Sequence, residues 1–224
     1  MSIVGPEASG FLPAWLAESA LFDDRTDAGR RLSAALPDDL HSPVVIGLTR
    51  GGVEIGTEVA RPLHAPLDVA IVARIHHPAE PEYSIGAVAP GGACYVVDRK
   101  GLSEAQLVVA TARARTEAGR LESRLHPHRR AIALEGRDVV LVDEAIVTGA
   151  TMLAAIAWAR AAHAACVAAA VPVGSLAGLE LVRPEADLLV CLNEFEYLGS
   201  RGVWFWDFPA LEDEDVLRLL EASR

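Results

Sequence analysis

The sequence predicts an α/β protein with a Rossmann-like parallel sheet flanked by helices. Short, continuously apolar runs such as 44–48 and 139–142 have the pattern of strands that are buried on both faces. These runs alternate with helix-forming stretches, and that order produces parallel strands joined by right-handed crossovers. The 224 residues, 51% of them hydrophobic, are enough for one sizeable domain.

The first part of the chain combines an arm with alternating helices and strands. Residues 1–22 are irregular, and we expect an arm that packs on the body or on a second subunit, followed by a single domain over 23–224. Asp24 is placed to cap a helix, with Arg25, Arg30 and Arg31 on the exposed side. The elements expected here are a helix at 25–36, a strand at 44–48, a loop at 49–52, a helix at 53–63, and a strand at 67–73 that ends at Arg74.

The second part changes character before the alternation resumes. Residues 75–100 contain several prolines and the pair Gly91-Gly92, so a mobile loop or a short hairpin is expected there rather than a helix. The remaining expected elements are a long amphipathic helix at 103–124, a strand at 139–143, a helix at 152–163, a strand at 167–173, a helix at 176–182, a strand at 188–192 and an acidic helix from about 212.

Composition excludes several classes of protein. The net charge is −11 and the sequence pI is about 5.1, which argues against broad nucleic-acid binding because that requires a basic surface. No apolar run reaches the roughly 18 residues of a membrane span, and no secretory signal is visible, so neither a membrane partner nor export is expected. The three cysteines are far apart in sequence, and a cytoplasmic location is the expectation.

The segment 138–152 carries the strongest functional signal. An apolar strand ends in two adjacent acids, Asp143 and Glu144, and a turn of small residues, Thr148–Thr151, then leads into a helix. Backbone N–H groups at a helix start suit a phosphate. Two carboxylates suit sugar hydroxyls or a divalent cation. A ribose 5-phosphate requires both features at this separation.

Two further segments are expected at the same edge of the sheet, because ligands bind outside the carboxyl ends of parallel strands. The loop Thr49, Arg50, Gly51 and Gly52 offers a flexible backbone and a guanidinium suited to phosphate, although an ordinary strand-to-helix turn has the same pattern. Arg74 also follows a strand, and a surface arginine is its default interpretation. Together with Arg50 it would supply positive charge for a pyrophosphate.

The segment Val-Val-Leu-Val-Asp-Glu-Ala-Ile-Val-Thr-Gly-Ala-Thr-Met resembles the phosphoribosyl-diphosphate signature of type I phosphoribosyltransferases. Other segments are similar to a bacterial branch of that family with poorly defined substrates, and these are Ala28–Leu32, Leu48–Val53, Ala65–Val69, Ile85–Val88 and the acidic C-terminal stretch. The resemblance covers most of residues 22–222. It implies the type I fold with a small hood, formed by about 193–208, and a flexible loop at about 76–95.

The resemblance also implies a role for each matching residue. Asp143 and Glu144 would bind the ribose hydroxyls, directly or through Mg²⁺, and the loop from Thr49 to Gly52 would bind pyrophosphate with Arg74. The catalytic set implied is Arg50, Arg74, Asp143 and Glu144. The residues implied to bind phosphoribosyl diphosphate are Thr49, Arg50, Gly51, Gly52, Asp143, Glu144, Ala145, Val147, Thr148, Gly149, Ala150 and Thr151. The aromatic residues expected at the acceptor hood are Tyr197, Trp204 and Trp206.

The implied activity is Mg²⁺-dependent transfer of a 5-phosphoribosyl group from phosphoribosyl diphosphate to an unidentified small acceptor, usually a nitrogenous one, with release of pyrophosphate, in a homodimeric enzyme of nucleotide metabolism. Glu144 and Ala145 depart from the branch's usual Asp-Gly, and Thr49 replaces a more usual proline. Val147 stands where purine-salvage members carry an aspartate that contacts the base. The absence of that aspartate makes hypoxanthine or guanine salvage less favoured, and the departures together point to an unusual acceptor or weakened catalysis.

Other functions remain open at this point. The same pocket could serve a non-catalytic sensor of phosphoribosyl diphosphate or of a nucleotide that regulates a protein partner. A nicotinamide-dependent enzyme is disfavoured because no G-x-G-x-x-G follows a strand. A serine hydrolase is disfavoured because Ser175 is misplaced in Gly174–Gly178. A metal role for His126 and His128 has little support.

Overall fold

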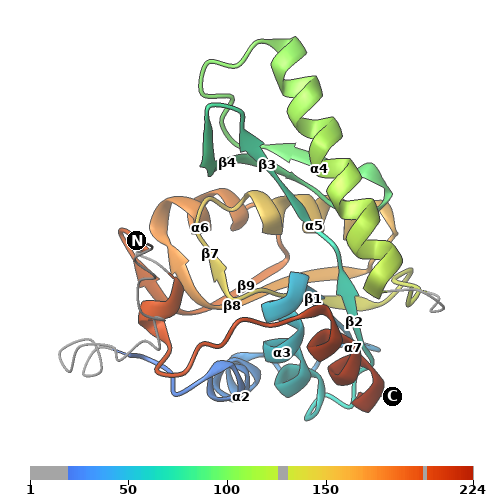
Figure 1. The fold of residues 1–224 in the computed structure, drawn as a ribbon. Coiled ribbons are helices and arrows are strands. Elements are labelled where there is room, and N and C mark those ends of the chain that lie inside the picture. Colours follow the sequence, from blue (N-terminus) through green and yellow to red (C-terminus); the bar gives the residue numbers. More distant parts are fainter. Residues whose placement is uncertain (1–19, 126–130, 199–200, 224) are drawn as a thin grey trace, which may run out of the picture.

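The computed structural model describes residues 20–125, 131–198 and 201–223. Its centre is a parallel sheet of six strands (Figure 1). Five of them are paired in the order β2-β1-β6-β8-β7, and the sixth, β9, also pairs with β8. The strands are β1 (Val44–Leu48), β2 (Leu67–Ala70), β6 (Asp138–Val142), β7 (Ala145–Ile146), β8 (Cys166–Ser175) and β9 (Leu188–Phe195). The predicted parallel sheet is therefore confirmed.

Helices cover both faces of this sheet. On one side lie α2 (Arg25–Ala35), α3 (Thr49–Ala60) and α7 (Asp213–Ala222), and on the other lie α5 (Ala150–Ala161) and α6 (Leu176–Val182) (Figure 1). Alternate residues of β6 enter the two cores, because Val139 and Leu141 pack on one side while Val140 and Val142 pack on the other. Burial on both faces explains why these strands are continuously apolar in sequence.

A second, antiparallel sheet stands apart from the first at the top of Figure 1. It contains β3 (Ala73–His77), β4 (Glu80–Val88) and β5 (Cys94–Val96), with the short 3-10 helix η1 (Pro90–Gly92), and α4 (Glu104–Leu125) packs against it. The hairpin alternative for 75–100 is thus confirmed. Whether the segment at about 76–95 moves as a flexible loop stays a prediction.

The prediction of one strand over 67–73 was wrong. The parallel strand ends at Ala70, and Ala73 begins the antiparallel sheet, so Arg74 is the second residue of β3 rather than the end of a parallel strand. Val72 is buried in the core around α5, whereas Ala73 packs in the small core beneath α4. An unbroken apolar run therefore crosses from one core to the next, and its sequence pattern cannot reveal the break.

Two helix starts also differ from the prediction. The expected loop at 49–52 is the first turn of α3, and α5 begins at Ala150 rather than at residue 152. The Asp24 cap is confirmed, because its Oδ1 accepts the Asp27 N–H at 2.7 Å. No helix in the part of the chain that the structure describes is long and apolar enough to cross a membrane.

Candidate functional site

The acidic pair lies at a break in a strand rather than at its end. Residues up to Val142 pair with β8 as β6, and Ala145 and Ile146 resume pairing with the same strand as β7. The side chain of Asp143 turns back so that its Oδ1 accepts the Glu144 N–H at 2.8 Å. Both acidic residues are buried. The break therefore places two carboxylates inside the protein, between the apolar residues that end β6 and those of β7.

Glu144 forms a buried ion pair with Arg25. The sequence pattern predicted that Arg25 would lie on the exposed side of its helix. That prediction was wrong: Arg25 is 5% exposed. Its Nε donates to Glu144 Oε1 at 2.7 Å, and its Nη1 donates to the Pro209 carbonyl oxygen at 2.9 Å. The guanidinium also lies 3.8 Å from the centroid of the Phe208 ring. Helical spacing alone cannot reveal such a pair, because its two partners are 119 residues apart.

The glycines at the start of α3 allow close packing against the acidic pair. A Cβ atom on Gly51 would lie 1.9 Å from Glu144 Oε1, and one on Gly52 would lie 2.3 Å from the Val142 carbonyl oxygen. Thr49 has a φ of 58°, in the left-handed region that non-glycine residues seldom occupy. The small residues therefore let the helix start approach the end of β6.

A cavity of about 220 Å³ opens at this point. It brings together several residues predicted for the site, Thr49, Arg50, Gly51 and Glu144, with two that were not predicted, Arg25 and Leu211.

Arg50 also has an internal partner at this edge. Its Nε and Nη2 each lie 2.8 Å from Asp213 Oδ1, and Arg124 Nη1 lies 3.2 Å from Oδ2 of the same carboxylate. Burial alone would raise the pKa of Asp213, but the hydrogen bonds and charges of Arg50 and Arg124 hold that pKa below its usual value. The first residue of α7 thus binds the arginine that was predicted to bind pyrophosphate.

The small-residue turn before α5 is braced from the neighbouring strand. Gly149 has a φ of 79°, which suits glycine, and α5 starts at the next residue. Ser175 Oγ donates to the Val147 carbonyl oxygen at 2.5 Å and accepts the Gly178 N–H at 3.0 Å. Ser175 therefore holds the turn and caps α6, which gives it a structural role in place of hydrolase chemistry.

Two helix starts at the site lack a side-chain cap, unlike those of α2 and α6. Asp24 and Ser175 accept backbone N–H groups at the starts of α2 and α6. By contrast, Leu48 and Gly149 at the starts of α3 and α5 supply no such bond. The first N–H groups of a helix have no partner within it, and together with the helix dipole they attract anions. Thr148 offers a weak contact, since the Ala150 N–H lies 3.4 Å from its Oγ1.

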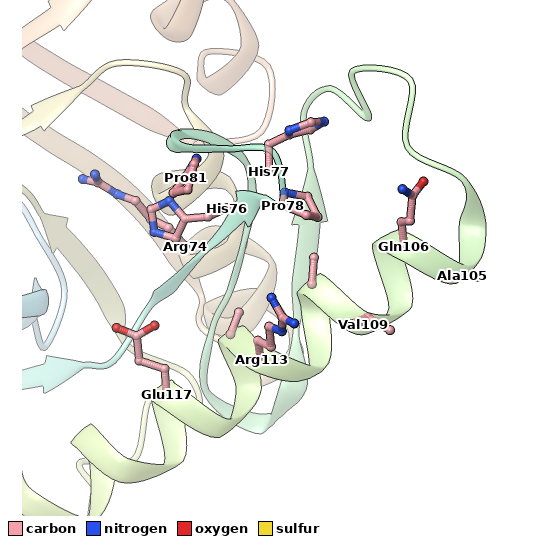
Figure 2. Close-up of a pocket in the computed structure, with 12 residues that line it drawn as sticks. Arg74, His76, His77, Pro78, Pro81, Ala105, Gln106, Val109, Arg113 and Glu117 are labelled. Atoms are coloured by element: carbon pink, nitrogen blue, oxygen red, sulfur yellow. The ribbon is translucent and has the colours of Figure 1, made fainter.

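Arg74 lines a different and larger cavity. This cavity of about 530 Å³ lies between the β3–β4 hairpin and α4, where Arg74 is accompanied by His76, His77, Arg113 and Glu117 (Figure 2). The structure brings Arg50, Gly51 and Glu144 together around one cavity, but Arg74 is not among the residues that line it.

Two of the predicted hood residues, Trp204 and Trp206, lie where the C-terminal segment meets the start of the described chain. Trp204 ends the short 3-10 helix η2 (Arg201–Trp204), and its ring stacks on Phe195 at a centroid distance of 4.3 Å. The backbone at Trp204 and Trp206 exchanges hydrogen bonds with Leu21 and Phe22. Tyr197 and Trp206 are exposed. Of the predicted arm, residues 20–22 pack on the body here, and the remainder lies outside the described residues.

Within the described ranges, no group of three or more histidine, cysteine, aspartate or glutamate side chains is arranged to hold a metal ion. His126 and His128 lie outside the described residues.

Comparisons with known proteins identify relatives over nearly the whole chain. A family profile described as "Phosphoribosyl transferase domain" matches residues 19–212. Two Mycobacterium tuberculosis proteins, MT0597 and Rv0571c, carry provisional names as phosphoribosyl transferases and are each 37% identical over 208 residues. The match covers 91% of this chain but 47% of each relative, so the chain spans about half their length.

A solved structure agrees with the fold. The crystal structure of TT1426 from Thermus thermophilus is 37% identical, with a TM-score of 0.76, and the match covers 89% of this chain and 97% of that one.

Proposed function

The chain belongs to the phosphoribosyl transferase domain family, and from that premise we propose that it transfers a 5-phosphoribosyl group from phosphoribosyl diphosphate to a small, nitrogenous acceptor. The observation that carries this proposal is the pair of helix starts at α3 and α5 without side-chain caps, with two buried carboxylates between them in the chain. One anion-binding helix start is expected for each phosphate end of the substrate.

The turn from Thr148 to Thr151 is proposed to bind the 5-phosphate. It offers the first N–H groups of α5 and two threonine hydroxyls, and its side chains carry no negative charge. Ala145 begins β7 and Val147 is exposed beside the turn, so both would border the same ligand. The buried Ser175 bridge supports this assignment, because it holds the turn through the Val147 carbonyl oxygen and leaves the N–H donors of the turn to a ligand.

Asp143 and Glu144 are proposed to bind the ribose hydroxyls, with Mg²⁺ shared between the acids and the substrate. Magnesium would neutralise charge that develops on the leaving pyrophosphate. Thr49, Gly51 and Gly52 would present the N–H groups of α3 to that pyrophosphate, and Arg50 would add its guanidinium. Bond breakage at the sugar C1 leaves negative charge on pyrophosphate, and these donors stabilise it.

Arg74 and the hood complete the proposal. Arg74 would reach the pyrophosphate if the β3–β4 hairpin closes over the substrate, which would also exclude water. Trp204, Trp206 and Tyr197 are proposed to border the acceptor. Homodimer formation and a cytoplasmic location stay predictions from the family resemblance.

A sensor of phosphoribosyl diphosphate is the alternative, and one observation favours it. Arg50 is already bound to Asp213 and Glu144 to Arg25, so two groups needed for catalysis have internal partners. The test is to measure pyrophosphate release with a panel of nitrogenous acceptors beside calorimetric binding of phosphoribosyl diphosphate in Mg²⁺. Turnover supports the transferase, binding without turnover supports the sensor, and an absence of binding contradicts both.

A further inference from the structure

Arg25 occupies an unusual position for the first residue of a helix. It follows the cap residue of α2, yet its side chain is buried against Glu144, the segment before α7 and an aromatic ring. Nε binds Glu144, Nη1 binds the Pro209 carbonyl oxygen, and the guanidinium lies over Phe208. These three contacts fix both the place and the orientation of the guanidinium plane, so the residue is not a solvated surface arginine.

The surroundings of Arg25 are rich in carboxylates. Glu144 lies 2.7 Å away, Glu54 lies 3.4 Å away, and Asp143 is adjacent to Glu144 in sequence. Burial raises the pKa of Glu54 against the lowering effect of Arg25, and Asp24, Glu144 and Asp215 raise it further. The positive charge of Arg25 therefore opposes the repulsion that Glu54 experiences from its acidic neighbours.

The Glu144 carboxylate lies between Arg25 and the start of α3. Oε1 of Glu144 is held between the Arg25 guanidinium and the backbone of Gly51, where a Cβ atom would come within 1.9 Å. Arg25 and Glu144 line the same cavity as Thr49 and Arg50. A guanidinium fixed at three points can therefore hold this carboxylate at the mouth of the proposed pyrophosphate site.

We infer that Arg25 is a positioning residue, which orients Glu144 toward the ribose hydroxyls and places a positive charge beside that carboxylate. This inference rests on the proposed function and adds to it a residue from the opposite end of the chain.

The test compares a ligand that contains ribose with one that lacks it. Calorimetry in Mg²⁺ measures the affinity of Arg25→Gln for phosphoribosyl diphosphate and, separately, for pyrophosphate. We expect a loss of about tenfold or more for phosphoribosyl diphosphate, as for other groups that orient a ligand-binding side chain, and a change of less than about twofold for pyrophosphate. Arg25→Lys should restore part of the loss. Arg31→Gln is the matched control, since Arg31 sits on the same helix in an exposed pair with Asp27.

A double-mutant cycle with Glu144 distinguishes loss of a positioning contact from general destabilisation of the protein. In a Glu144→Gln background, Arg25→Gln should change the affinity for phosphoribosyl diphosphate by less than about twofold, because the group that it orients is gone. Equal losses in both backgrounds, parallel losses for the two ligands, or an unchanged affinity would overturn the inference. If Arg25→Gln does not fold, the same affinities are measured for Arg25→Lys and for the double variant, which removes both charges. Wild-type protein that binds no phosphoribosyl diphosphate would instead overturn the proposed function itself.

Discussion

The starts of α5 and α3 follow strands of the same sheet but are prepared for ligands in different ways. At α5, the turn around Gly149 is built from uncharged residues and is held from behind by Ser175. At α3, the charged side chains already have internal partners, since Arg25 binds Glu144 and Arg50 binds Asp213. A phosphate can enter the first region without displacing an ion pair of these residues, whereas a ligand in the second must share or exchange them.

Binding affinity and control therefore arise in different parts of the site. A preformed and uncharged turn contributes affinity without rearrangement, because its donors are already oriented. A region of internal ion pairs costs free energy to open, and its contribution depends on how well the ligand replaces each internal carboxylate. We therefore expect substitutions near α3 to have larger and more varied effects than those near α5.

The largest effect is expected from Arg25→Ala, which removes the buried positive charge beside the start of α3. The substitution leaves Glu144 buried without its cation, and loss of one partner of a buried pair costs about 3–5 kcal/mol. Urea unfolding followed by circular dichroism measures the change in the free energy of unfolding. Arg31→Ala, which removes an exposed pair on the same helix, should cost less than about 1 kcal/mol. Equal costs for the two variants would contradict the burial argument.

The second prediction concerns the acidic pair that both regions share. Asp143→Asn combined with Glu144→Gln keeps the shapes of the side chains but removes their charge. We expect the affinity for phosphoribosyl diphosphate in Mg²⁺ to fall by about 10- to 100-fold, because the ribose hydroxyls and the cation lose their charged acceptors. Calorimetry with and without Mg²⁺ provides the measurement. Unchanged affinity in Mg²⁺ would rule out these two acids as ligands.

Ser175→Ala tests the braced α5 region and should have an intermediate effect. It leaves the Val147 carbonyl oxygen and the Gly178 N–H without the hydroxyl, so we expect a loss of about 1–3 kcal/mol in the free energy of unfolding. If the turn binds the 5-phosphate, the affinity for ribose 5-phosphate should fall as well. Ser123→Ala removes an exposed hydroxyl of α4 and serves as the control. A stable variant with normal affinity would show that the turn needs no brace.

The two regions also differ in how far the sequence could predict them. The α5 turn is local in sequence, so Thr148, Gly149 and the helix after them were predicted within two residues. The parallel sheet was predictable for the same reason, because burial on both faces gives each strand its own apolar run. The α3 region depends on pairs between distant residues, Arg25 with Glu144 and Arg50 with Asp213, and no local pattern encodes them. The break between Ala70 and Ala73 was missed because both sides of it are buried.

The smallest effect is expected from Asp213→Asn, which would make the α3 region more like the α5 region. Both partners of Asp213, Arg50 and Arg124, are partly exposed, so loss of these ion pairs should lower the free energy of unfolding by less than about 1 kcal/mol. Pyrophosphate would no longer compete with a carboxylate for Arg50, and its affinity should rise by about two- to fivefold. Calorimetry of pyrophosphate binding measures the gain, and weaker binding would mean that Asp213 orients Arg50 rather than blocking it.

The pH dependence of the same variant gives an independent check. Because the folded pKa of Asp213 is lowered, the carboxylate contributes stability that is fully present above its unfolded pKa, which is about 3.9. That contribution disappears as the pH falls through the lower, folded pKa. The stabilities of wild type and Asp213→Asn should therefore differ at neutral pH and converge in acid. A constant difference over this range would mean that the charge of Asp213 does not stabilise the fold, and Arg50 would then be open to a ligand without exchange.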